Sequence, residues 1–324
     1  MHSTAELQEK VKKIFSQIDL DAEPQELYEP ISYTLGLGGK RIRPLLLLMA
    51  CDMFGGDLND ALNPAIGFEI FHNFTLLHDD IMDQSPIRRG KETVYKKWNT
   101  NIAILSGDAM FALAYKYLIR TNEKVLPSIL TVFNQTALEV CEGQQFDMNY
   151  ETAEHVSIDD YIKMIRLKTA VLLAGSLKAG AIIGGADSED ADHLYSFGEN
   201  IGLAFQLKDD LLDVFGDEAV FGKRTGSDIV CNKKTFLYLK AFELAKGETL
   251  KQLKELFFSA ETDNEIKIKE VKNIYSELGV EHFAEEAMDK YHKLALIHLQ
   301  AIKVGTEQKQ ALTEFAAQLM KREK

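Results

Sequence analysis

Apolar residues recur along much of the chain at the spacing of an α-helix. Two sets show this most clearly, because their members lie three or four residues apart and would share one helical face. They are Ile102, Leu105, Ala109 and Ala112, in a segment that begins at Asn101, and Met164, Leu167, Val171 and Ala174 further along. No run alternates apolar and polar residues over more than a few positions, so the pattern predicts an all-α fold.

Proline and glycine indicate where these helices should end. The last of the six prolines is Pro127, and the absence of proline after it favours long uninterrupted helices. Glycine at 175, 180 and 184 would let helices approach closely. We expect helix breaks at residues 36–39, 55–56, 85–91, 121–122, 184–185 and 216–226. Because no linker or shift in composition separates the segments, we predict a single domain, residues 1–324.

Two helical stretches end in the same acidic pattern, Asp-Asp-x-x-Asp. The first is FTLLHDDIMD at residues 74–83, and the second is AFQLKDDLLD at residues 204–213. In each, the first and last aspartates are four residues apart and share a helical face. Three carboxylates in one turn repel each other unless a cation lies between them, and Mg²⁺ prefers such oxygen ligands together with substrate phosphate. The predicted metal ligands are Asp79, Asp80, Asp83, Asp209, Asp210 and Asp213.

The alternative for each acidic turn is a solvated helix end with no ligand. Apolar residues surround both turns, which argues against full solvation, and one repeat of the pattern makes coincidence less plausible. The repetition suggests two helices of similar role that face each other across an apolar cavity.

Basic residues follow the acidic turns closely in the sequence. Lys40, Arg41 and Arg43 come after a glycine pair, and Arg88 and Arg89 come directly after the first acidic turn. Lys168-Thr169 lies in an apolar stretch, and Lys223 and Lys233 follow the second turn. Any one of these groups could be an ordinary surface charge. Beside two metal-binding turns they suggest a site for diphosphates, to which arginine binds through paired hydrogen bonds.

Composition and charge exclude several classes of partner. The net charge is −13, and nucleic-acid binding is unlikely to be the function because it needs a basic surface. Three widely spaced cysteines do not suggest a disulfide framework, which fits a reducing compartment. The longest strongly apolar run, residues 44–51, is too short to span a bilayer, and the N-terminal residues show no signal sequence. We therefore expect a cytoplasmic protein without a membrane span.

In combination, the motifs resemble those of the trans-isoprenyl diphosphate synthases, the polyprenyl synthetase family. The matching segments are GGKRIRP, LLHDDIMDQSPIRRG, GQQFD, LKT, FQLKDDLLD and FGKRTGSD, which occur in the family's order between Gly38 and Thr235. The resemblance implies an isoprenoid synthase-type fold, a large helical bundle around a central apolar cavity. It also implies a Mg²⁺-dependent homodimeric enzyme that condenses isopentenyl diphosphate with an allylic diphosphate. The product would be a short all-trans prenyl diphosphate.

The resemblance further implies a role for each matched residue. The six aspartates should hold about three Mg²⁺ ions on the allylic diphosphate, with Asp213 in support. The diphosphate of isopentenyl diphosphate should be bound by Lys40, Arg43, His72 and Arg89, whereas Arg41 should be structural. The allylic diphosphate should be clamped by Arg88, Lys168 and Lys223. The remaining site residues are Thr169 and Gln206, which present oxygens to the developing cation, Gln144 and Asp147, which line the site, and Lys233, which closes a loop over it.

The length of the product should depend on residues one and two turns before the first acidic turn. These are Phe71, Phe74 and Thr75, and the bulky Phe74 could form the floor of the cavity. An aromatic residue here, without extra residues inside the acidic motif, resembles synthases that make C20. We therefore expect geranylgeranyl diphosphate, with farnesyl diphosphate as the second choice. Phe74 as an ordinary core residue remains an alternative.

Four other classes of protein share part of this pattern. A class I terpene cyclase would share the fold and the first motif, but it would not need GGKRIRP and would usually lack a second Asp-Asp-x-x-Asp. A non-catalytic subunit of a heteromeric synthase would typically have lost one motif. A di-iron protein, suggested by Glu69-x-x-His72, would need a second such pair. A His-Asp phosphohydrolase, suggested by His78-Asp79, would need further histidine ligands.

Overall fold

The computed structural model of the chain describes residues 2–216, 225–259 and 263–321. It divides into two compact units, which we describe one at a time. Unit 1 consists of Met1–Gln135, Gly175–Tyr195 and Ile302–Leu312, and unit 2 consists of Thr136–Ala174, Ser196–Ala301 and Thr313–Lys324. Four helices contribute residues to both units: α7 (Leu126–Thr152), α9 (Val171–Gly184), α10 (Ser188–Phe215) and α17 (Thr306–Met320).

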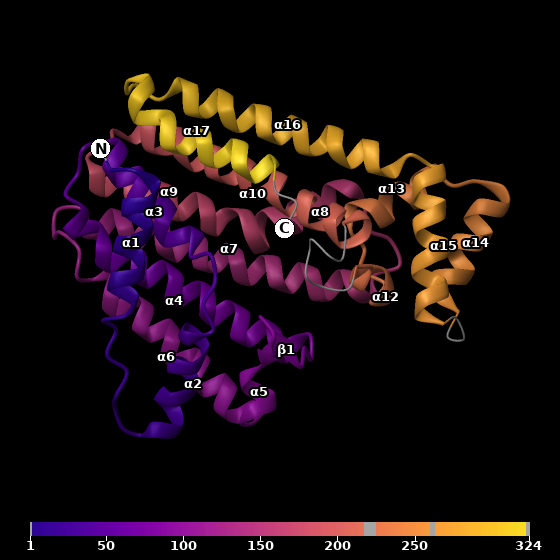
Figure 1. The fold of residues 1–324 in the computed structure, drawn as a ribbon, viewed down its shortest axis with the longest axis horizontal. Helices are drawn as coiled ribbons and strands as arrows, with labels where there is room; N and C mark the ends of the chain where they lie inside the picture. Colours follow the sequence, from indigo (N-terminus) through magenta and orange to yellow (C-terminus); the bar gives the residue numbers. More distant parts are fainter. Residues whose placement is uncertain (1, 217–224, 260–262, 322–324) are drawn as a thin grey trace. The chain divides into compact units, whose positions relative to one another are not determined.

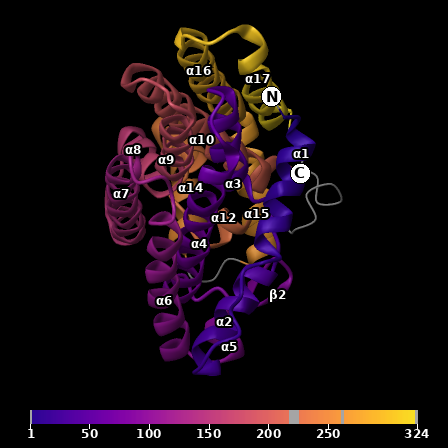
Figure 2. The ribbon, with the colours of Figure 1, turned by 90° about the vertical axis from the view of Figure 1, so that its left-hand side faces the viewer.

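Unit 1 is a helical bundle with one short hairpin. Its remaining elements are α1 (Thr4–Phe15), α2 (Gln25–Gly36), α3 (Ile42–Met53), α4 (Leu58–Met82), β1 (Ile87–Arg88), β2 (Lys91–Glu92), α5 (Val94–Lys97) and α6 (Thr100–Leu118). Figures 1 and 2 show α4 lying beside α6, its main neighbour, and α3 packs on α4 as well. Every residue of α3 from Pro44 to Met53 is buried, as expected for a helix that is apolar on all sides.

Glycines allow the helices of unit 1 to approach closely. A Cβ added at Gly67 of α4 would lie 2.9 Å from the carbonyl oxygen of Ala114 in α6. A Cβ at Gly180 of α9 would collide with the carbonyl oxygen of Leu47 in α3. The prediction that Gly180 serves close helix packing is therefore confirmed.

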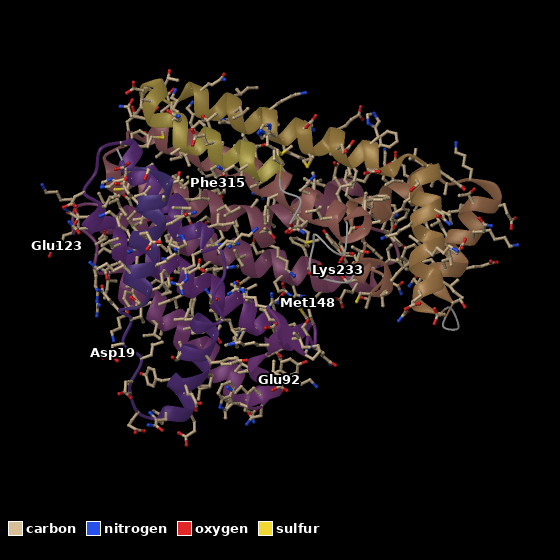
Figure 3. The ribbon with its side chains drawn as sticks, viewed as in Figure 1. Asp19, Glu92, Glu123, Met148, Lys233 and Phe315 are labelled. Atoms are coloured by element: carbon tan, nitrogen blue, oxygen red, sulfur yellow. The ribbon has the colours of Figure 1, made fainter. Side chains whose placement is uncertain are left out.

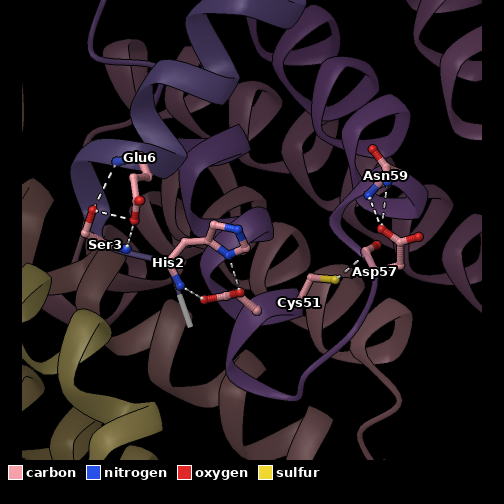
Figure 4. Close-up of polar contacts among 7 residues, drawn as sticks. His2, Ser3, Glu6, Cys51, Asp57 and Asn59 are labelled. Carbon is pink, nitrogen blue, oxygen red and sulfur yellow. Dashed lines mark hydrogen bonds and ion pairs between the residues drawn. The ribbon is translucent and has the colours of Figure 1, made fainter.

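Polar contacts hold the two ends of this bundle. The backbone N–H and the ring Nδ1 of His2 both lie 2.7 Å from the Asp52 carboxylate, and Ser3 caps α1 together with Glu6 (Figure 4). On the hairpin, the carbonyl oxygen of Glu92 accepts a 2.8 Å hydrogen bond from the Tyr33 hydroxyl of α2 (Figure 3). These contacts attach the N-terminus to α3 and the hairpin to α2.

Unit 2 is helical throughout its described residues. Its remaining elements are α8 (Ile158–Ile165), the π-helical turn η1 (Arg166–Ala170), α12 (Ser227–Val230), α13 (Phe236–Leu244), α14 (Gly247–Phe258), α15 (Asn264–Glu277) and α16 (Val280–Ala301). One apolar core unites them, and Leu207, Leu237, Leu253 and Val271 are among its fully buried members. The stripe that the sequence predicted around η1 is buried: Met164 belongs to this core, and Leu167, Val171 and Ala174 are buried as well.

The apolar stripe predicted for α6 does not form its buried face. The helix is present, but Leu105 is 60% exposed and Ala112 is exposed too. The buried face of α6 is instead formed by small residues and a methionine, including Ala103, Gly107 and Met110. The periodicity predicted the helix correctly, but it did not reveal which face lies inward.

One helical segment is long and apolar enough to cross a bilayer by length and composition alone. It is Ile158–Gly184, with a mean hydropathy of 1.4, and it is longer than the short run singled out from the sequence. Because 67% of its most apolar window is buried within the protein, it has the character of a core helix.

Candidate active site

The first acidic turn forms the C-terminal end of α4 in unit 1. Asp79 and Asp80 belong to the last helical turn, and Asp83 is the C-terminal cap, whose N–H donates to the Asp79 carbonyl oxygen at 2.8 Å. Asp80 is buried, whereas Asp83 is exposed. The carboxylates at this end of α4 therefore range from buried to exposed.

The hairpin after α4 returns a cation to this turn. Arg88, the last residue of β1, donates from Nε to Asp80 at 2.8 Å and from a terminal nitrogen to Asp79 at 3.5 Å. Burial raises the pKa of Asp80 to about 6, and Arg88 opposes that shift. Arg88 thus compensates the charge of the buried carboxylate in the protein without substrate.

A second cationic group lies in the loop before α3. Gly38 and Gly39 have positive φ angles of 78° and 128°, so the chain turns where a side chain would be strained. The Arg89 guanidinium fills the space that this turn leaves: it donates to the Gly38 carbonyl oxygen, and an added Cβ on Gly39 would lie 2.9 Å from it. The glycine pair and Arg89 therefore fit each other sterically.

Arg41, the N-cap of α3, and Arg43, in its first turn, differ in role. Arg41 lies 4.0 Å over the Phe15 ring and donates to the Leu35 carbonyl oxygen at 3.4 Å. Both contacts are structural, in line with the prediction for Arg41. Arg43 is more deeply placed, and burial lowers its pKa to about 10.

Glu69 is a buried acid among these arginines, and we had considered it only as a possible iron ligand. Its Oε1 accepts a 3.2 Å hydrogen bond from Asn73, whereas its Oε2 and the Nε of Arg43 have no hydrogen-bond partner among the described residues. Burial raises the pKa of Glu69, and Arg43 is the strongest charge opposing that shift. Burial and then the charge of Arg43 hold the pKa of His72 well below its usual value, which favours a neutral imidazole. Several cations thus share one buried acid, leaving an excess of positive charge for an anionic ligand.

The predicted chain-length residues lie on α4 before the acidic turn. Phe71 is fully buried and belongs to an aromatic cluster with Phe111 and Phe133. Phe74 is half-buried, with ring contacts at 5.4 Å to Phe111 and 4.7 Å to His78. The hydroxyl of Thr75 donates to a carbonyl oxygen one turn earlier in its own helix. Phe71 is therefore a core residue, and Phe74 lies at the edge of that core.

In unit 2, Lys168 and Thr169 lie in the π-helical turn η1, where the Val171 N–H donates to the Arg166 carbonyl oxygen five residues back. Glycines lie against this turn from two helices. A Cβ at Gly143 of α7 would collide with the Lys168 backbone, and one at Gly202 of α10 would lie 2.6 Å from Ala170. Turns of this kind often mark functional sites. The sequence did not predict it.

The side chains of η1 are held by polar partners on α7 and α10. Lys168 donates to Asp147 at 2.5 Å. Thr169 donates to the side-chain oxygen of Gln206 at 3.4 Å, and the amide of Gln206 donates to Asp210 at 3.2 Å. Five predicted residues are thereby brought together within unit 2.

Tyr161 of α8 extends the series of hydrogen bonds that runs from Thr169 through Gln206 to Asp210. The sequence did not predict this role. Its hydroxyl donates to the second carboxylate oxygen of Asp210, and both side chains are almost fully buried. Burial and the charge of Asp228 raise the pKa of Asp210, whereas the hydrogen bonds from Tyr161 and Gln206 lower it. The only sequence signal was the place of Tyr161 on the buried face of a short helix.

Asp213, the last aspartate of the second motif, supports the next segment of chain. Its carboxylate accepts 2.5 Å and 3.0 Å hydrogen bonds from the Ser227 hydroxyl and the Asp228 N–H, at the start of α12. Burial and then Asp213 raise the pKa of the half-buried Asp228, and Lys233 lowers it. Asp228 lies in the FGKRTGSD motif, but we had not singled it out. Asp213 thus acts in a supporting position, and Asp228 adds another carboxylate beside it.

Three further predicted residues are Lys223, Lys40 and Gln144. Lys223 lies outside the described residues. Lys40 is exposed, and Nε2 of Gln144 is buried without a partner among the described residues.

The carboxylates of the two acidic turns suit a Mg²⁺ ion that takes part of its ligands from the substrate. In the part of the chain that the structure describes, no three His, Cys, Asp or Glu side chains are grouped so that they could hold a metal ion alone. Mg²⁺ commonly uses only one or two carboxylates and takes its other ligands from phosphate and water. The all-oxygen donors at the two acidic turns therefore fit Mg²⁺ bound together with a diphosphate.

Comparison with known proteins gives a consistent result. A family model described as polyprenyl synthetase matches residues 24–277. A geranylgeranyl diphosphate synthase of Methanosarcina mazei is 43% identical over 222 residues, which cover 68% of each chain. A short chain isoprenyl diphosphate synthase of Methanothermobacter thermautotrophicus is 36% identical over 304 residues, or 94% of this chain and 92% of the relative. A crystal structure of a geranylgeranyl pyrophosphate synthase matches with a TM-score of 0.93 and 45% identity over 99% of both chains.

Proposed function

This chain belongs to the polyprenyl synthetase family and is a short-chain trans-prenyltransferase, and we propose that its product is geranylgeranyl diphosphate. Farnesyl diphosphate is the second candidate. The observation that carries the C20 product is the half-buried Phe74 before the first acidic turn. Acid and cation are paired at each motif, which supports diphosphate chemistry: Arg88 contacts Asp80 at the first, and the charge of Lys233 acts on Asp210 and Asp228 at the second. Several relatives are named as geranylgeranyl synthases, which also supports the C20 product.

The two substrates would use different parts of the site. The allylic diphosphate would lie at the acidic turns, together with Arg88 and Lys168. The diphosphate of isopentenyl diphosphate would lie at the basic cluster of Lys40, Arg43 and Arg89. The excess of arginine over the single acid Glu69 supports this second assignment.

The family uses Mg²⁺, and we propose that about three ions bind per site, as the six motif aspartates would allow. Magnesium, when bound, would stabilise the negative charge that develops on the leaving diphosphate. Asp79, Asp80, Asp83, Asp209 and Asp210 would hold it, with Asp213 in support. The hydrogen bonds of Asp210 to Tyr161 and Gln206 would fix the orientation of one such ligand.

The reaction would proceed through a carbocation. The allylic C–O bond breaks, and its electron pair leaves with the diphosphate, whose charge Arg88 and Lys168 stabilise. The double bond of isopentenyl diphosphate then attacks the allylic carbon and forms a new C–C bond. Loss of a proton from the neighbouring carbon restores a double bond, and the released diphosphate accepts that proton. Thr169 and Gln206, joined by a hydrogen bond, would present their oxygens to the cation.

We propose that residues 1–324 act as a single catalytic domain, because the mechanism uses residues of both acidic motifs. The family model supports it, because residues 24–277 include parts of both units. We further propose a homodimer in the cytoplasm. Exposed apolar side chains on α6 and α7 support a second copy: Leu105 is 60% exposed and Leu138 is 63% exposed.

Product analysis tests the proposal. The purified protein would be incubated with labelled isopentenyl diphosphate and dimethylallyl, geranyl or farnesyl diphosphate, with and without Mg²⁺. We expect labelled geranylgeranyl diphosphate from each starter, and none without the metal. A hydrocarbon formed from geranylgeranyl diphosphate alone would indicate a cyclase, and no turnover in any mixture would indicate a non-catalytic subunit; either result would overturn the proposal.

A further inference from the structure

A lysine is buried in unit 2 away from the predicted catalytic residues. Lys267 of α15 is only 6% exposed, which is unusual for this residue type. Its ammonium donates to the side-chain oxygen of Asn232 and lies 5.1 Å over the ring of Phe257. Burial lowers the pKa of Lys267, so the charge is held at a cost.

The partner of Lys267 lies next to a predicted diphosphate-binding residue. Asn232 has a left-handed backbone, with φ of 54°, and directly precedes Lys233 (Figure 3). The N–H of Lys233 donates to the Asp228 carbonyl oxygen at 2.9 Å, which closes the loop after α12. A contact that holds Asn232 in this conformation therefore fixes the backbone from which Lys233 projects.

Helix α15 also holds the other end of the same segment, which we call the clasped segment, residues 225–233. Lys272 donates to the Thr225 hydroxyl at 3.1 Å. Between the two lysines, Ile268 lies against Gly226, where an added Cβ would be 2.9 Å from its side chain. Asp213 binds the start of α12 from the side of the acidic motif. The clasped segment is thus held between the second acidic motif and α15.

We propose that Lys267 is a positioning residue for the diphosphate site: by holding Asn232, it places Lys233 and Asp228 for substrate binding. This inference rests on the proposed function and on the role that the family resemblance implies for Lys233, which closes a loop over the site. Lys267 itself touches neither substrate nor metal in this account. Its effect passes through the backbone of the clasped segment.

The test compares Lys267→Met with wild-type full-length protein. Methionine keeps the volume and removes the ammonium, and water can satisfy the exposed Asn232 amide, so the melting temperature should stay within a few degrees of the wild type or rise. We expect the KM for the allylic diphosphate to rise roughly tenfold, with a smaller change in kcat. Lys267→Arg should restore part of the affinity. Lys269→Met, an exposed lysine on the same helix, should leave both constants unchanged.

Two further measurements separate this inference from the proposed function. Asn232→Gly retains a left-handed backbone but removes the acceptor, so it should resemble Lys267→Met, and the double variant should be no worse than either. Hydrogen exchange should be faster at the amides of residues 226–233 in Lys267→Met, whether or not the enzyme turns over. Unchanged exchange and unchanged KM in an active enzyme would overturn the positioning role. If the wild-type protein showed no prenyl transfer, faster exchange in Lys267→Met than in the wild type would still support the contact between Lys267 and Asn232. That result would reject only the proposed function.

Discussion

At the scale of single residues, the buried hydrogen bond between Tyr161 and Asp210 is the feature that the sequence could least reveal. The two positions are 49 residues apart, and no local pattern links them. The motif identified Asp210 by its spacing, but its buried donor became visible only in the fold. The same applies to Glu69, whose partners Arg43 and Arg89 come from other segments.

Removal of the Tyr161 hydroxyl should weaken Mg²⁺ binding. In Tyr161→Phe, Asp210 loses a donor that orients its carboxylate, and we expect the Mg²⁺ concentration for half-maximal turnover to rise about 10- to 100-fold. The measurement is turnover against Mg²⁺ concentration, with thermal melting in a chelator as the stability check. Tyr291→Phe, at a half-buried tyrosine elsewhere in unit 2, is the control. An unchanged Mg²⁺ curve would mean that the contact serves the fold alone.

Phe74 should set the length of the product. Shortening its side chain in the series Phe74→Leu and Phe74→Ala should open space before the first acidic turn and lengthen the main product stepwise by five-carbon units. Its half-buried position at the edge of the aromatic cluster suggests that the cost in stability will be smaller than at the fully buried Phe71. Chromatography of the dephosphorylated products gives the measurement. The same product from all three proteins would place the floor elsewhere and leave Phe74 as a core residue.

At the scale of elements, the sequence predicted some helix breaks but not others: those at residues 153–157 and 245–246, which interrupt the long helices expected after Pro127, were not predicted. The breaks expected near residues 36–39, 55–56, 85–91, 121–122 and 184–185 all separate helices in the structure. These breaks depend on local glycine and proline chemistry, which a sequence displays directly. The inward face of α6 was not predictable in this way, because small residues such as Gly107 are buried there while Leu105 is exposed. Tertiary contacts decide which face of a helix is buried, and local periodicity does not show those contacts.

The π-helical turn η1 should be sensitive to added volume at its glycine neighbours. In Gly143→Ala the new methyl group would collide with the Lys168 backbone, so we expect a loss of about 1–3 kcal/mol in the free energy of unfolding and lower activity. Gly36→Ala is a matched control, because an added Cβ there has no neighbour within 4 Å. Denaturant unfolding of both variants gives the comparison. Equal stability of the two would show that α7 can move away from η1 at little cost.

At the scale of the whole molecule, the class of fold and the chemistry were predictable, whereas the division of the chain was not. Composition and motif order indicated one all-α enzyme, and the family match agrees with that class. The two compact units share four helices, so no linker or change in composition marks their boundaries. A boundary that falls inside a continuous helix leaves no trace in a single sequence.

The proposed homodimer can be tested on the exposed face of α7. Leu138→Glu places a charge at a side chain that is 63% exposed, so it should not disturb the monomer, yet it should weaken a dimer that buries this position. Light scattering over a range of concentrations would show a lower mass for the variant than for the wild type. Ile266→Glu, at a side chain of similar exposure on α15, should retain the wild-type mass. A wild-type protein that is monomeric at all concentrations would reject the dimer.

The extra residue in the π-helical turn also fixes how the helix face before the turn is rotated relative to the face after it. Each residue of an α-helix turns the chain by roughly 100°, so one surplus residue rotates everything before it relative to everything after it. Deleting a single residue from 166–170 would leave an unbroken regular helix, but Lys168 and Thr169 could no longer point towards Asp147 and Gln206 while the stripe at Val171 and Ala174 kept its place in the core. Length variation should therefore not be tolerated within these five residues.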